Sequence, residues 1–267
     1  MTLSLNTNMA ASKAAIHLAN NTENLNKSLE RLSSGKRINS ASDDAGGLAV
    51  AMKMEANISS LDAGVRNIGN GLSFLQVQDS ALSSAQDILS RMLELNAGTG
   101  DPFYNGEFDD EIAALGDQVA ALKSNTFNGQ ALFGGTTLTL SFDGVAANNI
   151  TINQEDLDTA IGVADDAANM AALGADTAAR KTAIEGLIDA VSALRASNGG
   201  MQSRLQGTLK NVESQIVGLQ SALGRIVDVD IAAESANLAK QQILVQASAS
   251  MVAQANSANN AILKLLQ

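Results

Sequence analysis

The 267-residue chain contains no cysteine and no tryptophan, one histidine and one proline. Without cysteine there is no disulfide framework, no thiolate nucleophile and no zinc knuckle, and one histidine cannot build a multi-histidine metal centre. Aromatic residues make up 3% of the chain, so few large side chains are available to line a ligand pocket, whereas hydrophobic residues reach 45%. The composition therefore argues against an enzyme, predicts no cofactor and no metal, and favours long helices.

Charge and hydropathy exclude two further classes of partner. The formal net charge is −11 and the isoelectric point is about 4.5, whereas nucleic-acid binding needs a basic surface. No run of about 18 apolar residues occurs, so no membrane-spanning helix is expected. Residues 1–8 lack the basic stretch and apolar core of a cleavable secretory signal, which by itself indicates a cytosolic chain. We therefore expect neither a nucleic-acid nor a membrane partner.

Apolar residues recur in heptads along the first long segment. Spacing that alternates by four and three residues keeps one face of a helix turned toward a partner in a coiled coil. The positions are Met54, Ile58, Leu61, Val65, Ile68, Leu72, Leu75, Asp79, Leu82, Gln86, Leu89 and Leu93. Asp79 and Gln86 are the polar exceptions, and we interpret them as groups that set the register between helices rather than as packing errors.

Two more series predict the helices that pack against the first. One consists of Leu205, Leu209, Val212, Ile216, Leu219, Leu223 and Ile226, and extends backward through Leu194 and Met201. The other, Ile112, Leu115, Val119 and Leu122, follows a break that contains Pro102, the single proline. The expected fold is mainly α: a long antiparallel coiled-coil helical bundle.

A small β-hairpin region is expected at the distal end of this bundle. Two alternating runs, Thr137–Phe142 and Asn149–Asn153, are accompanied by turn dipeptides such as Asn128-Gly129 and Asp143-Gly144. Residues 156–173 are acidic and weakly periodic, which predicts a short exposed helix.

Both ends of the chain carry heptads of their own, although they are far apart in sequence. Near the start these are Ala11, Leu18, Leu25 and Leu32, with Ala15, Thr22 and Leu29 in the intervals; near the end they are Ile231, Leu238, Val245, Val252 and Leu266, widened by Leu244, Met251 and Leu265. Two such helices leave much of each apolar stripe facing water. We therefore expect the ends to pair, to pack against other copies of the chain and to be largely unfolded before assembly.

Residues 31–52 read RLSSGKRINSASDDAGGLAVAM, which closely resembles the most characteristic stretch of bacterial flagellin. The resemblance continues through Arg66-Asn67, Gly71-Leu72-Ser73 and Thr126–Gly129, and returns in residues 225–230, 242–247, 254–256 and 263–266. It covers both arms of the chain. The large outer domains of longer flagellins are missing, so the sequence resembles a short, minimal form.

The resemblance implies a structural, self-assembling protein without enzymatic activity. Flagellins are exported unfolded by a type III pathway without a cleaved signal, which reconciles this sequence with a secreted, extracellular place in the flagellum filament that drives motility. The implied partners are further copies in a helical homo-polymer, an export chaperone, the filament cap and the hook-associated proteins. The implied domains are an inner, channel-lining segment at 1–42, the two parts of a middle domain at 43–175 and 176–227, and a second inner segment at 228–267.

Three sets of residues are expected to carry function. The inner helices would assemble through Leu18, Leu25, Leu32, Leu238, Leu244, Val245, Met251, Val252, Leu265 and Leu266. The family motif would hold the spoke between inner and middle layers through Arg31, Ser33, Gly35, Asn39, Asp43 and Asp44. The resemblance also suggests a surface for Toll-like receptor 5 made by Arg91, Leu95 and Glu111. Leu93 stands where stimulating members of the family usually have a second arginine.

Three alternatives are weighed against the filament subunit. A hook-filament junction protein of the same superfamily shares the terminal heptads, but the unbroken motif at residues 33–48 favours the filament subunit. An enzymatic flagellin needs a His-Glu-x-x-His helix, which a single histidine cannot provide. A coiled-coil adaptor that never polymerises would stay monomeric or form a closed oligomer.

Overall fold

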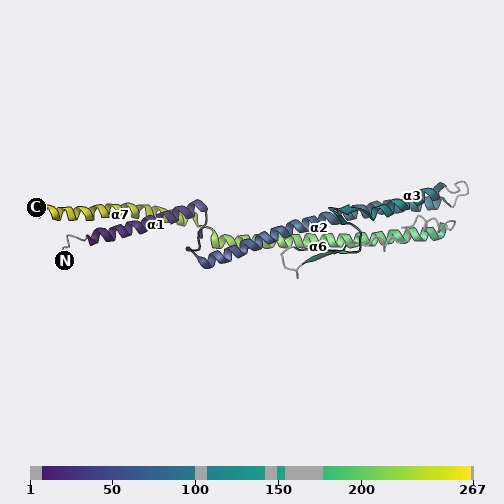
Figure 1. Cartoon of the computed structure of the whole chain (residues 1–267). Helices are drawn as coiled ribbons and strands as arrows, with labels where there is room; N and C mark the ends of the chain where they lie inside the picture. The colour runs from purple at the N-terminus through teal and green to yellow at the C-terminus, as the bar shows by residue number, and fades with distance from the viewer. Residues whose placement is uncertain (1–7, 100–106, 142–148, 154–176, 266–267) are drawn as a thin grey trace. The chain divides into compact units, whose positions relative to one another are not determined.

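The computed structural model describes residues 8–99, 107–141, 149–153 and 177–265. The chain divides into two compact units, one formed by Met1–Ala56 with Gly218–Gln267 and the other by Asn57–Val217. The helices are α1 (Met9–Ser34), α2 (Ala45–Gly98), α3 (Glu107–Leu122), α6 (Thr177–Val227) and α7 (Ile231–Leu265). The helix expected at residues 156–173 lies outside the described residues. Within the described part, the mainly α prediction is confirmed (Figure 1).

In the first unit, α1 and α7 lie side by side and run antiparallel (Figure 1). The Oδ1 atom of Asn8 caps the start of α1 by accepting a hydrogen bond from the Ala11 amide, and Gly35 ends the helix in the left-handed conformation at φ 70°. The Asn8 amide group donates to the carbonyl of Ala255 at 3.0 Å, and the Asn21 amide group donates to the hydroxyl of Ser248 at 2.8 Å.

The seam between α1 and α7 contains the predicted columns of Leu18, Leu25 and Leu32 and of Leu238, Val245 and Val252, but its intermediate positions on α1 differ from the predicted ones. The half-buried and buried positions are Ala11, Ala14, Leu18, Asn21, Leu25, Ser28 and Leu32 on α1, and Glu234, Leu238, Gln241, Val245, Ser248, Val252 and Ala255 on α7. The predicted intermediate positions Ala15, Thr22 and Leu29 are exposed. Small and polar residues fill the alternate seam positions because they allow the two helices to approach closely and to bond across the seam, as Asn21 and Ser248 do.

In the second unit, α2 and α6 pair antiparallel along the predicted heptads. All twelve heptad positions from Met54 to Leu93 on α2 are buried or half-buried, and so are the seven from Leu205 to Ile226 on α6. Hydrogen bonds that cross the pair join Asn96 to the carbonyl of Thr177 and Asn198 to the carbonyl of Leu75. The heptad prediction for both helices is therefore confirmed.

The third predicted helix and the first hairpin complete this core. Ile112 and Val119 of α3 are buried. Strands β1 (Thr126–Phe127) and β2 (Gln130–Ala131) pair through a turn at Asn128 and Gly129, whose φ angles of 50° and 79° are those that an Asn-Gly hairpin turn requires. The ring of Phe127 meets the buried ring of Phe74 edge-on, with centroids 6.2 Å apart.

Strands β3 (Thr137–Leu140) and β4 (Ile150–Asn153) pair antiparallel, as expected, but they do not lie at the distal end of the helices. The amide group of Asn67 on α2 donates to the carbonyl of Ser141, and a side chain at Gly71 would collide with Leu140. The strands therefore lie against the middle of α2. The predicted position at the distal end is wrong because α3 runs back alongside α2 before the strands begin (Figure 1).

Phe74→Ala should lower the free energy of unfolding of the second unit by about 3–5 kcal/mol, because it leaves a cavity between α2 and β1. Urea unfolding followed by circular dichroism measures the change. Val77→Ala, on an exposed side chain three residues away, is the control and should change stability little. Equal stability of the Phe74 and Val77 variants would contradict this description of the core.

Candidate assembly surface

The α1–α7 pair buries one seam and leaves large apolar side chains in contact with solvent. Ile16 is 60% exposed, Ile243 66% and Met251 63%. Met9, Leu29, Ile231 and Leu244 are also exposed. No described residue covers these side chains, so the pair exposes more contiguous apolar surface than is usual for a soluble pair of helices.

Part of this apolar surface is a groove between the two helices. The groove is lined by Ala10, Lys13, Ala14, His17 and Asn21 from α1 and by Leu244, Ala247, Ser248 and Met251 from α7. His17 is exposed there. Among the described residues, no group of three or more His, Cys, Asp or Glu side chains is placed to hold a metal ion. The groove is therefore suited to apolar contact.

The predicted assembly residues fall into two groups. Leu18, Leu25 and Leu32 on α1, and Leu238, Val245 and Val252 on α7, lie in the seam between the helices. Leu244 and Met251 lie beside the seam and are exposed. Leu265 is the last residue of α7, and Leu266 lies outside the described residues. The exposed column at Leu244 and Met251 is thus the part of the prediction that faces outward.

Backbone hydrogen bonds tie the segment after α1 to the segment between α6 and α7. The Arg37 amide donates to the carbonyl of Val227 at 2.6 Å, and the Val229 amide donates to the carbonyl of Gly35 at 3.0 Å. The Arg37 guanidinium also donates to the carbonyl of Ile226 at 2.7 Å. The left-handed conformation of Gly35 turns the chain into this pairing, which is the physical reason for a glycine there.

Asp43 and Asp44 organise the loop that leads into α2. The Asp43 carboxylate accepts hydrogen bonds from the backbone amides of Ser40 and Asn39 and from the Ser40 hydroxyl. These bonds, with Ser40 first and Asn39 second, hold the pKa of Asp43 below its ordinary value. Asp44 caps α2 by accepting a bond from the Gly47 amide at 2.9 Å. Both acids therefore act here through direct hydrogen bonds to the backbone.

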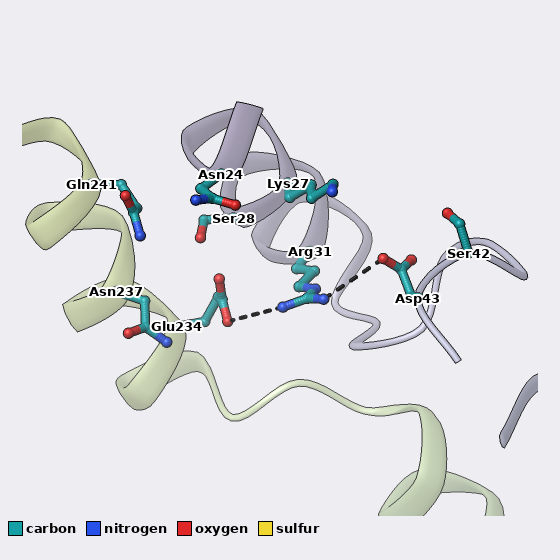
Figure 2. A pocket seen from close by; sticks show the side chains of 9 residues that line it. All are labelled: Asn24, Lys27, Ser28, Arg31, Ser42, Asp43, Glu234, Asn237 and Gln241. Carbon is teal, nitrogen blue, oxygen red and sulfur yellow. Dashed lines mark ion pairs between the residues drawn. The ribbon is translucent and has the colours of Figure 1, made fainter. Parts of the chain in front are cut away.

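Arg31 joins this loop to α7. Its guanidinium lies 3.7 Å from the carboxylate of Asp43 and 4.0 Å from that of Glu234, between the two acids (Figure 2). Glu234 is almost fully buried, in the first turn of α7, and Asp230 caps that helix by accepting bonds from the amides of Ala232 and Ala233. We call Arg31, Asp43 and Glu234 the spoke cluster.

Arg31 and Asp43 were predicted from the sequence, whereas Glu234 was not. A signal was present, because Glu234 stands seven residues before Gln241 and fourteen before Ser248, in the same seam column. The remaining residues named for the spoke lie in or next to the same loop: the backbone N–H of Asn39 donates to Asp43, and Ser33 is exposed on the last turn of α1. The side chains of Asn24, Lys27, Ser28, Ser42, Asn237 and Gln241 complete a polar pocket around the cluster (Figure 2).

The three residues named for the receptor surface differ in their exposure to solvent. Arg91 on α2 and Glu111 on α3 are both exposed and form an ion pair at 3.1 Å, which raises the pKa of Arg91. Leu95 is only 4% exposed and belongs to the core of the second unit. The structure therefore brings two of the three residues together on the surface and buries the third.

Comparison with known proteins accounts for this set of features. Models of the bacterial flagellin N-terminal and C-terminal helical regions match residues 5–137 and 182–266. Flagellin of Bacillus subtilis is 34% identical, with 98% of this chain and 99% of that protein covered. The chain belongs to the bacterial flagellin family. Flagellin of Halalkalibacterium halodurans is 37% identical over the same shares of the two chains.

A solved structure supports the fold alone. A flagellar hook-associated protein from Vibrio parahaemolyticus matches with a TM-score of 0.56 at 16% identity, covering 70% of this chain and 100% of that chain. The full-length matches to flagellins favour the filament subunit over the junction-protein and adaptor alternatives.

Family membership settles the general function. The protein is a structural subunit that self-assembles into the helical filament of the bacterial flagellum, and the family is not enzymatic. Flagellins form this filament outside the cell. No helix in the described part of the chain has the length and apolar character needed to cross a membrane.

Asp43→Asn should remove a pH dependence of stability. Because folding lowers the pKa of Asp43 below its ordinary 3.8, its carboxylate stabilises the fold above that pH, and the contribution is lost as the pH falls through the folded-state value. Thermal unfolding of the assembled protein, in which this unit is ordered, should show a smaller loss of stability between pH 7 and acidic pH in the variant than in the native chain.

Asp62→Asn, at an exposed carboxylate of α2, is the control for the change of charge. The account fails if the Asp43 variant loses as much stability in acid as the native chain does.

Proposed function

We propose that the α1–α7 pair is the inner element of the filament and that neighbouring copies cover its exposed apolar column. The observation that carries the proposal is the exposure of Ile16, Ile243, Leu244 and Met251, which nothing in the described part of the chain covers. At about 25 cal/mol per Å² of apolar area, neighbouring subunits can supply the stability that the pair does not supply for itself.

The seam between the two helices supports the same proposal. Ala14, Ser28 and Ser248 occupy seam positions that a self-sufficient coiled coil fills with leucine or isoleucine, so each contributes little apolar area. Helices with so little tertiary contact are marginal in water. The inner element therefore becomes stably ordered when other copies pack on it, which makes assembly and folding of this unit one event.

The contacts between copies are heterologous, because the covered column is on the outside of the α1–α7 pair and meets a different surface of the next copy. Repetition of a heterologous contact that does not close gives an open helical tube. The channel-lining segments at 1–42 and 228–267 and the middle domain at 43–227 follow as proposed roles within that tube.

The route to the filament and the accessory partners are proposed on the same basis. Export in an unfolded state suits a chain without cysteine, since nothing in it can cross-link in an oxidising setting. An export chaperone, the filament cap and the hook-associated proteins are the proposed partners before, during and at the base of assembly.

Leu244→Asp should abolish polymerisation while leaving the second unit folded, because it places a charge in a column that becomes dry on assembly. Sedimentation and negative-stain microscopy measure filament yield, and circular dichroism of the unpolymerised protein checks the fold. Ser250→Asp adds the same charge to an exposed polar position of α7 and should keep more filament. Filaments of normal length from the Leu244 variant would overturn the proposed surface.

Toll-like receptor 5 is a further proposed partner, and the exposed Arg91–Glu111 pair supports it. Arg91→Ala should weaken binding of the monomeric protein to the purified receptor ectodomain, measured by surface plasmon resonance. Lys181→Ala removes an equally exposed cation from α6 and is the control. Identical affinities of the two variants would remove Arg91 from the receptor surface.

A further inference from the structure

A carboxamide interrupts a buried apolar column of α6. Val191, Asn198, Leu205 and Val212 follow one another at intervals of seven and are all buried, Asn198 with 1% of its surface exposed. An amide at such a position costs stability unless its hydrogen bonds are satisfied. A leucine there would continue the column, so the asparagine needs a reason of its own.

All polar atoms of this carboxamide are engaged, the nitrogen with α2 and the oxygen with the next turn of α6. The amide group of Asn198 donates to the side-chain oxygen of Gln78 at 2.9 Å and to the carbonyl of Leu75 at 3.1 Å. Its oxygen accepts from the amide group of Gln202 at 2.7 Å. Gln78, also fully buried, donates to the carbonyl of Leu132 just after β2 at 2.8 Å. We call Gln78, Asn198 and Gln202 the amide layer.

One turn of α6 away, a second polar contact crosses the same pair. Arg195 donates to the carboxylate of Asp79 at 3.2 Å and to the side-chain oxygen of Gln86 at 2.6 Å. Both acceptors are the polar exceptions of the α2 heptads, seven residues apart. Because Arg195 and Asp79 are each about one-third exposed, this contact contributes little energy. The contact is informative because of its geometry: one side chain of α6 bonds to two residues of α2 that are one heptad apart.

The apolar residues alone do not distinguish one register from the next. A slip of one heptad brings leucine opposite leucine again, but it places Gly71 or Ala85 where Gln78 had been, and neither has a side chain that can accept a hydrogen bond. The same slip leaves Arg195 with only one of its two acceptors. An unpaired buried polar group disfavours the slipped state by about 5- to 150-fold.

We propose that the amide layer, assisted by Arg195, determines the register of α6 against α2. The inference goes beyond subunit assembly, because it concerns what makes every copy alike before copies meet. Any surface formed jointly by α2 and α6 has one shape only if their register is single. A filament of identical contacts needs this uniformity in each subunit.

Asn198→Leu is the decisive substitution, and the absence of cysteine makes the measurement clean. Spin labels on Asn70→Cys of α2 and Lys210→Cys of α6, both exposed positions, report the axial offset of the two helices by pulsed dipolar spectroscopy. The native background should give one distance. The Asn198 variant should keep its helix content and its melting temperature or exceed it, and should gain a second population offset by about 10 Å, the rise of seven helical residues.

Asn211→Leu is the matched control, since it removes an exposed carboxamide from α6 and should leave one distance. Adding Arg195→Met to Asn198→Leu should enlarge the second population. The filament yield of the mixed-register protein should fall relative to the control. A single native distance in the Asn198 variant would overturn the proposal, and so would loss of its helical fold, because that would make the amide layer a requirement for folding rather than for register.

Discussion

When only two helices pack together, each buries one stripe of its surface and leaves the rest in contact with water. The two units of this chain differ mainly in how the remaining apolar surface is covered. The α1–α7 pair closes its seam with small and polar residues such as Ala14 and Ser248, and it leaves Ile243 and Met251 in water. The second unit escapes the limit because α3 and two short hairpins cover further faces of α2, which buries Phe74 and Ile152. This difference in coverage supports the proposal that the second unit is stable by itself and that the first is completed by assembly.

Polar side chains at seam positions recur in both units, with different consequences. In the first unit Glu234 pairs with Arg31, which also faces the Asp43 loop, so the seam is linked to the segment that follows α1. In the second unit Asn198 forms bonds that only one alignment of the helices satisfies. Apolar residues supply most of the attraction between helices, whereas these few polar groups decide which alignment the attraction stabilises.

The sequence was sufficient where periodicity is the cause of structure. The heptads from Met54 and from Leu205, and the Asn128-Gly129 turn, follow from the local chain and were predicted correctly. Prediction failed where distant contacts decide. The heptad spacing from Leu18 does not show whether the intermediate seam position is three residues later, at Asn21, or four residues later, at Thr22. The position of the partner helix α7 decides between them. Glu234 and Asn198 were missed for the same reason: each lies on a seam column, but its bonding partner lies on another element.

The pairing of the first helix with the last has a kinetic consequence. Asn8 bonds to Ala255 across 247 residues of sequence, so formation of this unit must close a loop that holds nearly the entire chain. The entropic penalty of such closure grows with loop length, and folding slows as mean contact order rises. Prior folding of residues 57–217 shortens the effective loop to the segments outside it. The terminal helices are therefore expected to dock last, after the interior of the sequence has collapsed, and to detach first when conditions weaken the fold.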